Sequence, residues 1–401
     1  MRRATAGTGP QPSVDPLRVR GLFGDYSRRQ REYAELRGAV AERSRLAAMW
    51  RGACEGVHLC HTTKVPAGMT ISTPTVVGCL PGDPVALIVR LLPGQLPRDV
   101  EDQASRLAPA MGAARLRVTP RGEQHVRVDL LAHDPLADVF TLPAVVSAMA
   151  DIPLFIGTAD TGLELRSAWA RRPHCIVQGA TGSGKSSWTY GQLSDAAACP
   201  DVLVAGLDPS GLLWRPFAGT RHAGWQVSGL TADLAAHEKL LRRLVDEMDR
   251  RTTGLPADTD SLTPTVEQPL MVVVLEDYAG LIQSAEAADR KHAARLRALI
   301  MRLLAEGRKA AIRVVILVQR AEANVVGAFE RSNCALRISF GVDSPESVRL
   351  LHPAAPDPDD HVSAPPGVAL LSAPGVPLVR FRAGLVGDYA AYCRRVQVAC
   401  S

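Results

Sequence analysis

A glycine-rich stretch near the middle of this sequence narrows the choice of fold more than any other segment. It matches the phosphate-binding pattern G-x-x-x-x-G-K-[ST] in full, and its glycines let backbone N–H groups curl around a polyphosphate. Lys185 would place a positive charge near the β- and γ-phosphates, and the Ser186 hydroxyl can ligate Mg²⁺. We therefore expect the loop to hold ATP and Mg²⁺ through Gly179, Ala180, Thr181, Gly182, Ser183, Gly184, Lys185, Ser186 and Ser187.

The flanking sequence predicts an α/β fold. Residues 175–177 form a short apolar run before the loop, and residues 186–193 can begin a helix whose positive end faces the anion. Further strand-like runs alternate with helical patterns, which indicates βαβ units and a mainly parallel sheet with ligands at its carboxyl edge. The predicted strands are 175–177, 202–207, 270–275, 314–318, 336–340 and 378–382, with a loop at 357–367 and a closing helix at 388–396.

Two adjacent acids follow the buried run 271–275. In phosphate-loop ATPases one acid at this place orients the Mg²⁺ shell and the next polarises the attacking water. By position, Glu276 takes the metal-side role and Asp277 the water-activating role. The alternative is that both acids cap the following helix, because Asp and Glu favour helix N-termini.

A glutamine, Gln319, ends the next predicted strand. A glutamine at the tip of the strand beside the acid strand can sense the γ-phosphate by hydrogen bonding and report hydrolysis as a change of shape. The alternative is a structural amide. The intact phosphate loop and the paired acids favour the sensing role for Gln319.

Charge and composition bound the remaining possibilities. The chain has 401 residues and a net charge of +5, and residues 1–51 carry eleven Arg against five acids. Such a basic arm suggests nucleic acid or a membrane surface, although a solvated helix face is an equal alternative. Eight cysteines without a C-x-x-C pair fit a reducing compartment. Without a predicted transmembrane helix or signal peptide, we expect a cytoplasmic protein that reaches a membrane only through a partner.

The chain divides into four predicted parts. Residues 1–16 are expected to be disordered, 17–62 to form a basic helical arm, 63–146 a small α+β module and 147–401 the motor ATPase domain. The α+β module is indicated by alternating apolar and polar residues at 116–119 and 125–130 and by a predicted helix over 99–111.

Several further stretches together resemble the FtsK/SpoIIIE family of DNA pumps, and in particular its short plasmid-transfer relatives. Residues 173–186, PHCIVQGATGSGKS, resemble the family's PH-apolar-GATGSGKS sequence, and Asp208-Pro209 resembles its DPK turn with a serine in place of the lysine. Residues 246–251, 307–320 and 333–344 are similar to three further family motifs. The family's paired acids usually read Asp-Glu, whereas this chain has Glu-Asp.

The resemblance implies a RecA-like P-loop ATPase that assembles into a hexameric ring around double-stranded DNA. In such rings a neighbour's arginine stabilises charge on the γ-phosphate. Motif position makes Arg308 the first choice for this arginine and Arg337 the second, the alternative being surface arginines that pair with local acids. Residues 321–331 are a candidate loop facing the channel.

The resulting expectation is an ATP-driven double-stranded DNA translocase that moves plasmid or mobile-element DNA between cells. Two alternatives remain open at this point. One is a coupling ATPase of the type VII secretion kind, which shares the motor fold but grips protein. The other is a nucleotide-binding regulator with little turnover, because Asp277 is one methylene shorter than the usual glutamate at its position.

Overall fold

A computed structural model describes residues 40–66, 68–229, 234–323, 325–355, 358–362 and 364–401. Internal contacts divide the chain into one unit that ends at His133 and a second that starts at Asp134. Residues 134–146, assigned to the small module from the sequence, therefore group with the second unit. The predicted disordered start and residues 17–39 of the predicted arm lie outside the described residues.

The first unit is a four-stranded antiparallel sheet packed against helices. Its strands follow the order β3 (Thr75–Leu80), β4 (Val85–Arg90), β6 (His125–Leu131), β5 (Arg115–Pro120). Apolar residues alternate along these strands, and those of one face bury against a helix over residues 40–56 and the short helices α2 (Pro97–Glu101) and α3 (Ala104–Ala110). Trp50 anchors the long helix by donating from Nε1 to the Pro74 carbonyl at 3.0 Å.

Three details of this unit differ from the prediction, and one of them is strand β3, which was not predicted. The single helix expected over 99–111 is two short helices, because the chain turns at Asp102 and Gln103. A hairpin of β1 (His61–Val65) and β2 (Gly68–Ser72) was not predicted, and it falls across the expected boundary between arm and module.

The second unit is built on a ten-stranded sheet with the order β11-β10-β12-β13-β9-β14-β15-β16-β7-β8. The first six strands are parallel, and the last four add antiparallel partners at one side. This confirms the predicted mainly parallel α/β sheet. The strands are β7 (Leu154–Ala159), β8 (Glu164–Ser167), β9 (Cys175–Gln178), β10 (Val202–Asp208), β11 (Gln226–Ser228), β12 (Leu270–Leu275), β13 (Ile312–Val318), β14 (Leu336–Phe340), β15 (Val368–Ala373) and β16 (Val376–Arg382).

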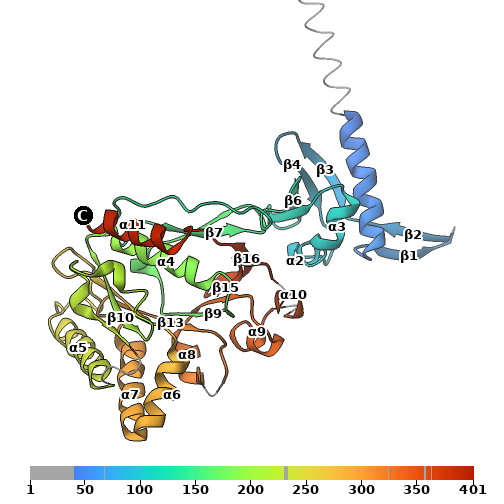
Figure 1. The fold of residues 1–401 in the computed structure, drawn as a ribbon. Helices are drawn as coiled ribbons and strands as arrows, with labels where there is room; N and C mark the ends of the chain where they lie inside the picture. Colours follow the sequence, from blue (N-terminus) through green and yellow to red (C-terminus); the bar gives the residue numbers. More distant parts are fainter. Residues whose placement is uncertain (1–39, 67, 230–233, 324, 356–357, 363) are drawn as a thin grey trace, which may run out of the picture. The chain divides into compact units, whose positions relative to one another are not determined.

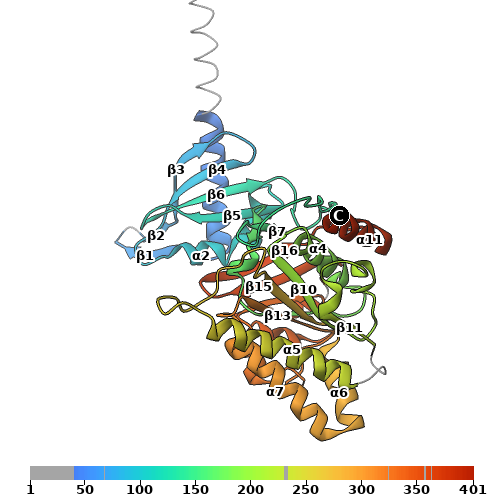
Figure 2. The ribbon, with the colours of Figure 1, turned by 90° about the vertical axis from the view of Figure 1, so that its left-hand side faces the viewer.

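Helices cover both faces of this sheet (Figures 1 and 2). α4 (Lys185–Ala197) and α11 (Tyr389–Cys400) lie on one face, and α5 (Leu234–Thr253), α6 (Tyr278–Ala288) and α7 (Arg290–Glu306) lie on the other. The remaining helices, α8 (Ala328–Asn333), α9 (Pro345–Leu351) and α10 (Asp359–Val362), are short. α10 falls inside the predicted loop at 357–367 and corrects that expectation.

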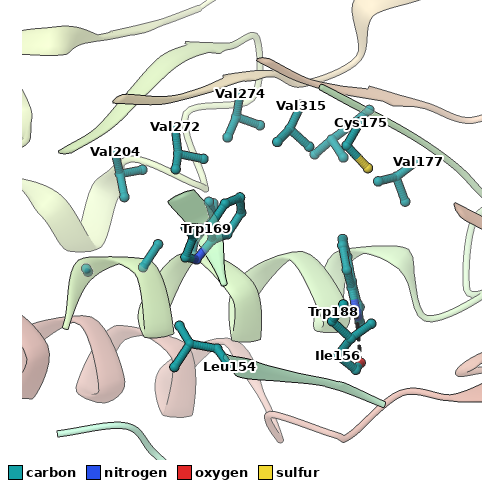
Figure 3. Close-up of a cluster of buried hydrophobic side chains, with 14 of the residues drawn as sticks. Leu154, Ile156, Trp169, Cys175, Val177, Trp188, Val204, Val272, Val274 and Val315 are labelled. Atoms are coloured by element: carbon teal, nitrogen blue, oxygen red, sulfur yellow. Dashed lines mark hydrogen bonds between the residues drawn. The ribbon is translucent and has the colours of Figure 1, made fainter. Parts of the chain in front are cut away.

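Successive strand residues point to opposite faces, so the sheet supports two separate cores. Figure 3 shows part of one core, where Trp169 and Trp188 face the valines of the central strands. The Trp188 indole also donates to the Ile156 carbonyl at 3.2 Å. Because both faces are buried, the central strands are nearly continuous apolar runs, and this made them predictable from sequence.

The described helices include none that is both long and apolar enough to cross a bilayer.

Candidate functional site

The phosphate loop connects β9 to α4 at the carboxyl edge of the sheet. Gly182 and Gly184 have φ angles of +80° and +100°, a region that favours glycine. A Cβ atom on Gly184 would lie 2.6 Å from the Gly367 nitrogen, so the loop also needs glycine here for close packing. The sequence prediction of a strand, a loop and a helix is confirmed in that order.

The two ends of the loop are fixed and its centre is open. The Gly179 N–H donates to the Val318 carbonyl at 3.2 Å, and the Ala180 N–H donates to the Gly341 carbonyl at 2.9 Å. No protein acceptor is recorded for the N–H groups of Gly182 and Gly184 within the described chain. The buried Ser183 hydroxyl also lacks a partner there. Unpaired donors around such a curl of backbone fit an anion.

Lys185 begins α4 and its ammonium group is buried beside the carboxyl edge. Its Nζ donates to the Val318 carbonyl at 3.1 Å. Burial lowers the pKa of Lys185, and the nearby Glu276 and Asp277 oppose that shift. A phosphate arriving at the loop would offer the ammonium a stronger partner than a neutral carbonyl.

Ser186 and Ser187 are adjacent but differ in their surroundings. Ser186 is exposed, and its hydroxyl has no protein partner among the described residues. The Ser187 hydroxyl accepts a hydrogen bond from the Val386 N–H at 3.3 Å. The geometry leaves the Ser186 hydroxyl free for a metal ion and gives the Ser187 hydroxyl a structural contact.

Glu276 follows β12 and lies in a poorly solvated position. Burial raises its pKa to about 7, Lys185 opposes this shift, and the nearby carboxylate of Asp208 adds to it. Asp208 is itself engaged, because it accepts from the Ser210 N–H at 2.8 Å and from the Leu213 N–H at 2.8 Å. The Glu276 carboxylate has no hydrogen-bond partner in the part of the chain that is described, so it is available to organise Mg²⁺ together with Ser186.

Asp277 has a left-handed backbone with φ +45° and is the N-cap of α6. Its Oδ1 accepts from the Gly280 N–H at 3.4 Å, a long contact. A Cβ atom on Gly280 would lie 2.3 Å from Asp277 Oδ2, so the glycine makes room for this carboxylate. The capping alternative therefore describes the present contact of Asp277, while the water-activating role stays a prediction.

Two glutamines lie at the tips of neighbouring strands. Gln319 follows β13, is exposed and has no recorded partner in the described chain. Gln178 ends β9 and is fully buried, and its amide contacts Ala321, Ser339 and Ser347. Sequence reasoning missed Gln178, although a polar residue that closes an apolar strand directly before the phosphate loop is a usable signal.

The two candidate trans arginines differ in the structure. Arg308 is exposed, lies between α7 and β13 at the amino edge of the sheet, and its side chain has no recorded partner in the described chain. Arg337 lies in β14 and donates to three carbonyls of its own chain, those of Arg331, Cys334 and Leu351. The geometry thus favours Arg308 as the arginine available to another subunit.

The candidate channel loop at 321–331 carries little free positive charge. Val325 and Val326 are buried, and the rest of the stretch leads into α8. The Arg331 side chain donates to the Val326 carbonyl, and the preceding Arg320 pairs with Asp343 and Glu322. Contacts to phosphates from the described part of this stretch would have to come largely from its backbone.

This chain has sequence relatives among DNA translocases. No protein-family model matches the sequence. The chain is 25% identical over 276 residues to the DNA translocase FtsK 2 of Neisseria meningitidis serogroup A, covering 59% of this chain and 26% of that protein. It is 24% identical over 322 residues to the DNA translocase FtsK of Vibrio vulnificus, covering 70% of this chain and 32% of that protein. The chain thus spans about a quarter to a third of these relatives.

Solved structures show the same fold. The monomer form of the pCW3 conjugation coupling protein TcpA with ATPγS aligns with a TM-score of 0.54 and 16% identity, covering 88% of this chain and 99% of that one. Two ATPases of the EssC protein of Geobacillus thermodenitrificans align with a TM-score of 0.53 and 14% identity, covering 65% of this chain and 51% of that one. The Thermomonospora curvata type VII secretion ATPase EccC aligns with a TM-score of 0.51 and 22% identity, covering 66% of this chain and 32% of that one.

The resemblance expected from the motifs is confirmed: this chain has the P-loop ATPase fold and is similar in sequence to DNA translocases of the FtsK kind.

Proposed function

We propose that this protein is an ATP-driven translocase of double-stranded DNA that works in the transfer of plasmid or mobile-element DNA. The observation that carries the nucleotide half of this proposal is the meeting of an open phosphate loop, Lys185 and the buried Glu276 at one edge of the sheet. The DNA half rests on the relatives reported by sequence, which are DNA translocases.

Each residue at the carboxyl edge has a distinct task in this proposal. The loop backbone and Lys185 bind the phosphates, while Ser186 and Glu276 hold Mg²⁺. Bound Mg²⁺ neutralises charge on the β- and γ-phosphates. Asp277 accepts a proton from the attacking water after its contact with Gly280 loosens, and Gln319 senses the γ-phosphate.

The proposed assembly is a homo-hexamer with the ATP sites between subunits. Arg308 lies at the opposite edge of the sheet from its own phosphate loop, so it can act only on nucleotide bound by a neighbour. Its exposure and its lack of a recorded partner in the described chain support this role. We propose Arg337 as a structural residue instead. A membrane-protein partner would hold the ring at the site of transfer, with the protein itself on the cytoplasmic side.

The alternative of a type VII coupling ATPase has less support. EccC and EssC share the fold at 22% and 14% identity, which says nothing of the substrate. A regulator with little turnover would need a defective site, yet the loop, Lys185 and both acids are present and grouped.

The test is ATP hydrolysis by the full chain with and without long double-stranded DNA. We expect DNA to stimulate hydrolysis and the Lys185→Ala variant to abolish it at either condition. Displacement of a triplex-forming strand from the same DNA then reports movement. Nucleotide binding without any stimulation by DNA would contradict the proposal and would favour the regulator or a protein substrate.

A further inference from the structure

The residues between β13 and α8, numbers 319–327, form what we call the connecting segment. It starts at the tip of β13, beside the phosphate loop. Its described part is well packed, because Ala321, Val325 and Val326 are buried in the core and the Val326 N–H donates to the Glu322 carbonyl at 2.8 Å. The described residues of the segment therefore have a defined conformation.

Gln178 holds the start of the connecting segment. Its Oε1 accepts from the Ala321 N–H at 3.0 Å, and its Nε2 donates to the Ser339 hydroxyl at 2.7 Å and the Ser347 carbonyl at 3.0 Å. β9 lies between β13 and β14, so this one amide joins both neighbouring strands. Gln178 directly precedes Gly179, and a displacement of the phosphate loop acts on this amide first.

Tyr278 holds the other end of the segment through α8. It is fully buried, and its hydroxyl donates to Glu330 Oε1 at 3.0 Å. Glu330 is only 5% exposed, so this hydrogen bond occupies a poorly solvated position, where its loss is costly. Tyr278 directly follows Asp277, so a movement of this acid pulls on the same contact.

A third contact explains why the segment would respond to nucleotide. The Lys185 ammonium donates to the carbonyl of Val318, the last residue of β13, at 3.1 Å. A γ-phosphate competes for that ammonium and releases the carbonyl at the very start of the segment. All three contacts thus join the connecting segment to the two nucleotide motifs.

We propose that Gln178 and Tyr278 are positioning residues that make the conformation of the connecting segment depend on whether the nucleotide site is filled. The inference rests on the proposed nucleotide site. In this proposal the connecting segment links the nucleotide site to DNA, because its conformation changes when nucleotide binds. Neither Gln178 nor Tyr278 needs to contact the substrate directly.

The test is hydrogen exchange, read by mass spectrometry, of peptides covering residues 319–331 with and without Mg²⁺ and ATPγS. In the unmodified full chain we expect nucleotide to change exchange in these peptides. In Tyr278→Phe and Gln178→Leu this response is lost, while nucleotide still protects residues 179–187. Tyr392→Phe is the matched control, because it removes another buried tyrosine hydroxyl, which donates to the Leu213 carbonyl at 2.9 Å far along the chain from the segment.

A merely structural role predicts a different result. The variants would then exchange faster by the same factor with and without nucleotide, and that outcome overturns the proposal, as does an unmodified chain whose segment ignores nucleotide. If Gln178→Leu does not fold, Tyr278→Phe carries the test alone, because it removes a single oxygen atom and keeps the ring.

DNA-stimulated hydrolysis separates this inference from the proposed function. We expect Tyr278→Phe to reduce the stimulation by DNA about fivefold with the basal rate retained, the lower end of the range for coupled sites. Suppose that nucleotide changes exchange in the unmodified chain, that the variants lose this response, and that DNA does not stimulate hydrolysis. This result would contradict the DNA proposal and would still support the coupling. Equal stimulation and equal exchange responses in all variants overturn the coupling and leave the DNA proposal intact.

Discussion

The two edges of the ten-stranded sheet differ in whether several of their polar side chains have hydrogen-bond partners within the described chain. At the carboxyl edge, the Ser186 hydroxyl, the Glu276 carboxylate and the Gln319 amide have no recorded hydrogen-bond partner among the described residues. At the amino edge, arginines are paired with backbone. Arg313 donates to the Ala170 carbonyl at 2.7 Å and Arg251 to the Pro269 carbonyl at 2.9 Å.

This difference distinguishes side chains that are available to bind a ligand from side chains that stabilise the fold. The buried arginines of this edge satisfy carbonyls that would otherwise be unpaired, and their own burial costs less because they are hydrogen-bonded. Side chains that must bind a ligand cannot also be paired with groups of their own chain. Arg308 differs from these arginines of the amino edge, because it is exposed and has no recorded partner in the described chain. In this respect it is like the unpaired side chains of the carboxyl edge.

The largest expected effect concerns Arg308. In the proposed ring, Arg308→Ala lowers the rate of ATP hydrolysis by about 10³-fold, as removal of a trans arginine does, because a developing charge in the neighbour's site loses its partner. Nucleotide affinity of the isolated chain stays unchanged. Steady-state hydrolysis of the assembled protein and nucleotide titration of the dilute protein measure the two quantities.

Two variants control this prediction. Lys309→Ala removes the neighbouring exposed cation and should leave hydrolysis intact. Arg337→Ala should instead lower the free energy of unfolding by about 2 kcal/mol, since three carbonyls lose a donor. A catalytic loss in Arg337→Ala without destabilisation, beside an active Arg308→Ala, would reverse the assignment of the two arginines.

The next effect concerns Asp277 at the carboxyl edge. Gly280→Ala places a Cβ atom where Asp277 Oδ2 now lies, so the carboxylate must move. We expect kcat to fall by about 10²-fold, the usual penalty for a misplacement of about 1 Å, with nucleotide affinity retained. Helix stability should change little, because the gain of roughly 1 kcal/mol from replacing glycine by alanine is offset by loss of the Asp277 cap contact, which costs about as much.

A loss of activity without a loss of stability makes this variant informative. Gly52→Ala is the control, since Gly52 is also helical, and it is exposed with nothing within 4 Å of an added Cβ atom. It should add stability without changing hydrolysis. Full activity in Gly280→Ala would show that the position of the Asp277 carboxylate in this structure does not matter to the reaction.

The sequence predicted the carboxyl edge better than the amino edge for a physical reason. Backbone curvature around phosphates demands glycines at fixed spacing, so the loop is visible in one short motif. The arginines of the amino edge look alike in sequence, and only folding decides that Arg337 meets three carbonyls while Arg308 meets none. Gln178 was missed because its three partners come from elsewhere in the chain.

The secondary structure was likewise predicted only in part from the sequence. β12 and β14 were predicted with the observed bounds. β12 is a continuous apolar run, as expected for a strand buried on both faces, whereas β14 also contains Arg337 and Ser339. β8 was missed because it is a half-exposed edge strand that mixes apolar with charged residues. β7, β11 and β15 were also missed, although β7 and β15 are mostly buried. The split between α2 and α3 depends on a turn at Asp102 that helix propensity does not reveal.

A smaller effect tests the cost of an unpaired acid at the carboxyl edge. Burial raises the pKa of Glu276 from 4.5 to about 7, so the folded chain holds this proton more tightly than the unfolded chain. Its ionisation then destabilises the fold increasingly as pH rises from about 4.5 to 7, and fully above that. Glu276→Gln removes this cost, so it should raise the free energy of unfolding by about 2 kcal/mol at pH 8 and by little near pH 4.5.

Urea unfolding of the nucleotide-free protein at the two pH values measures the difference. Comparing variant with unmodified chain cancels other titrating groups, such as Asp195, whose pKa burial raises to about 6. Glu322→Gln, at an exposed acid, should change neither value. An equal gain at both pH values would mean that the charge of Glu276 is not what burial penalises.

The smallest expected change in stability concerns two neighbouring serines of the loop. Ser187→Ala removes the acceptor for the Val386 N–H and should lower the free energy of unfolding by about 1 kcal/mol, with hydrolysis unchanged. Ser186→Ala should leave stability unchanged and remove Mg²⁺-dependent hydrolysis, because its hydroxyl serves no contact within the described chain. The rule drawn from the two edges thus applies to adjacent residues: the paired hydroxyl supports the fold and the unpaired one serves the ligand. A loss of hydrolysis in Ser187→Ala without a loss of stability would contradict this rule.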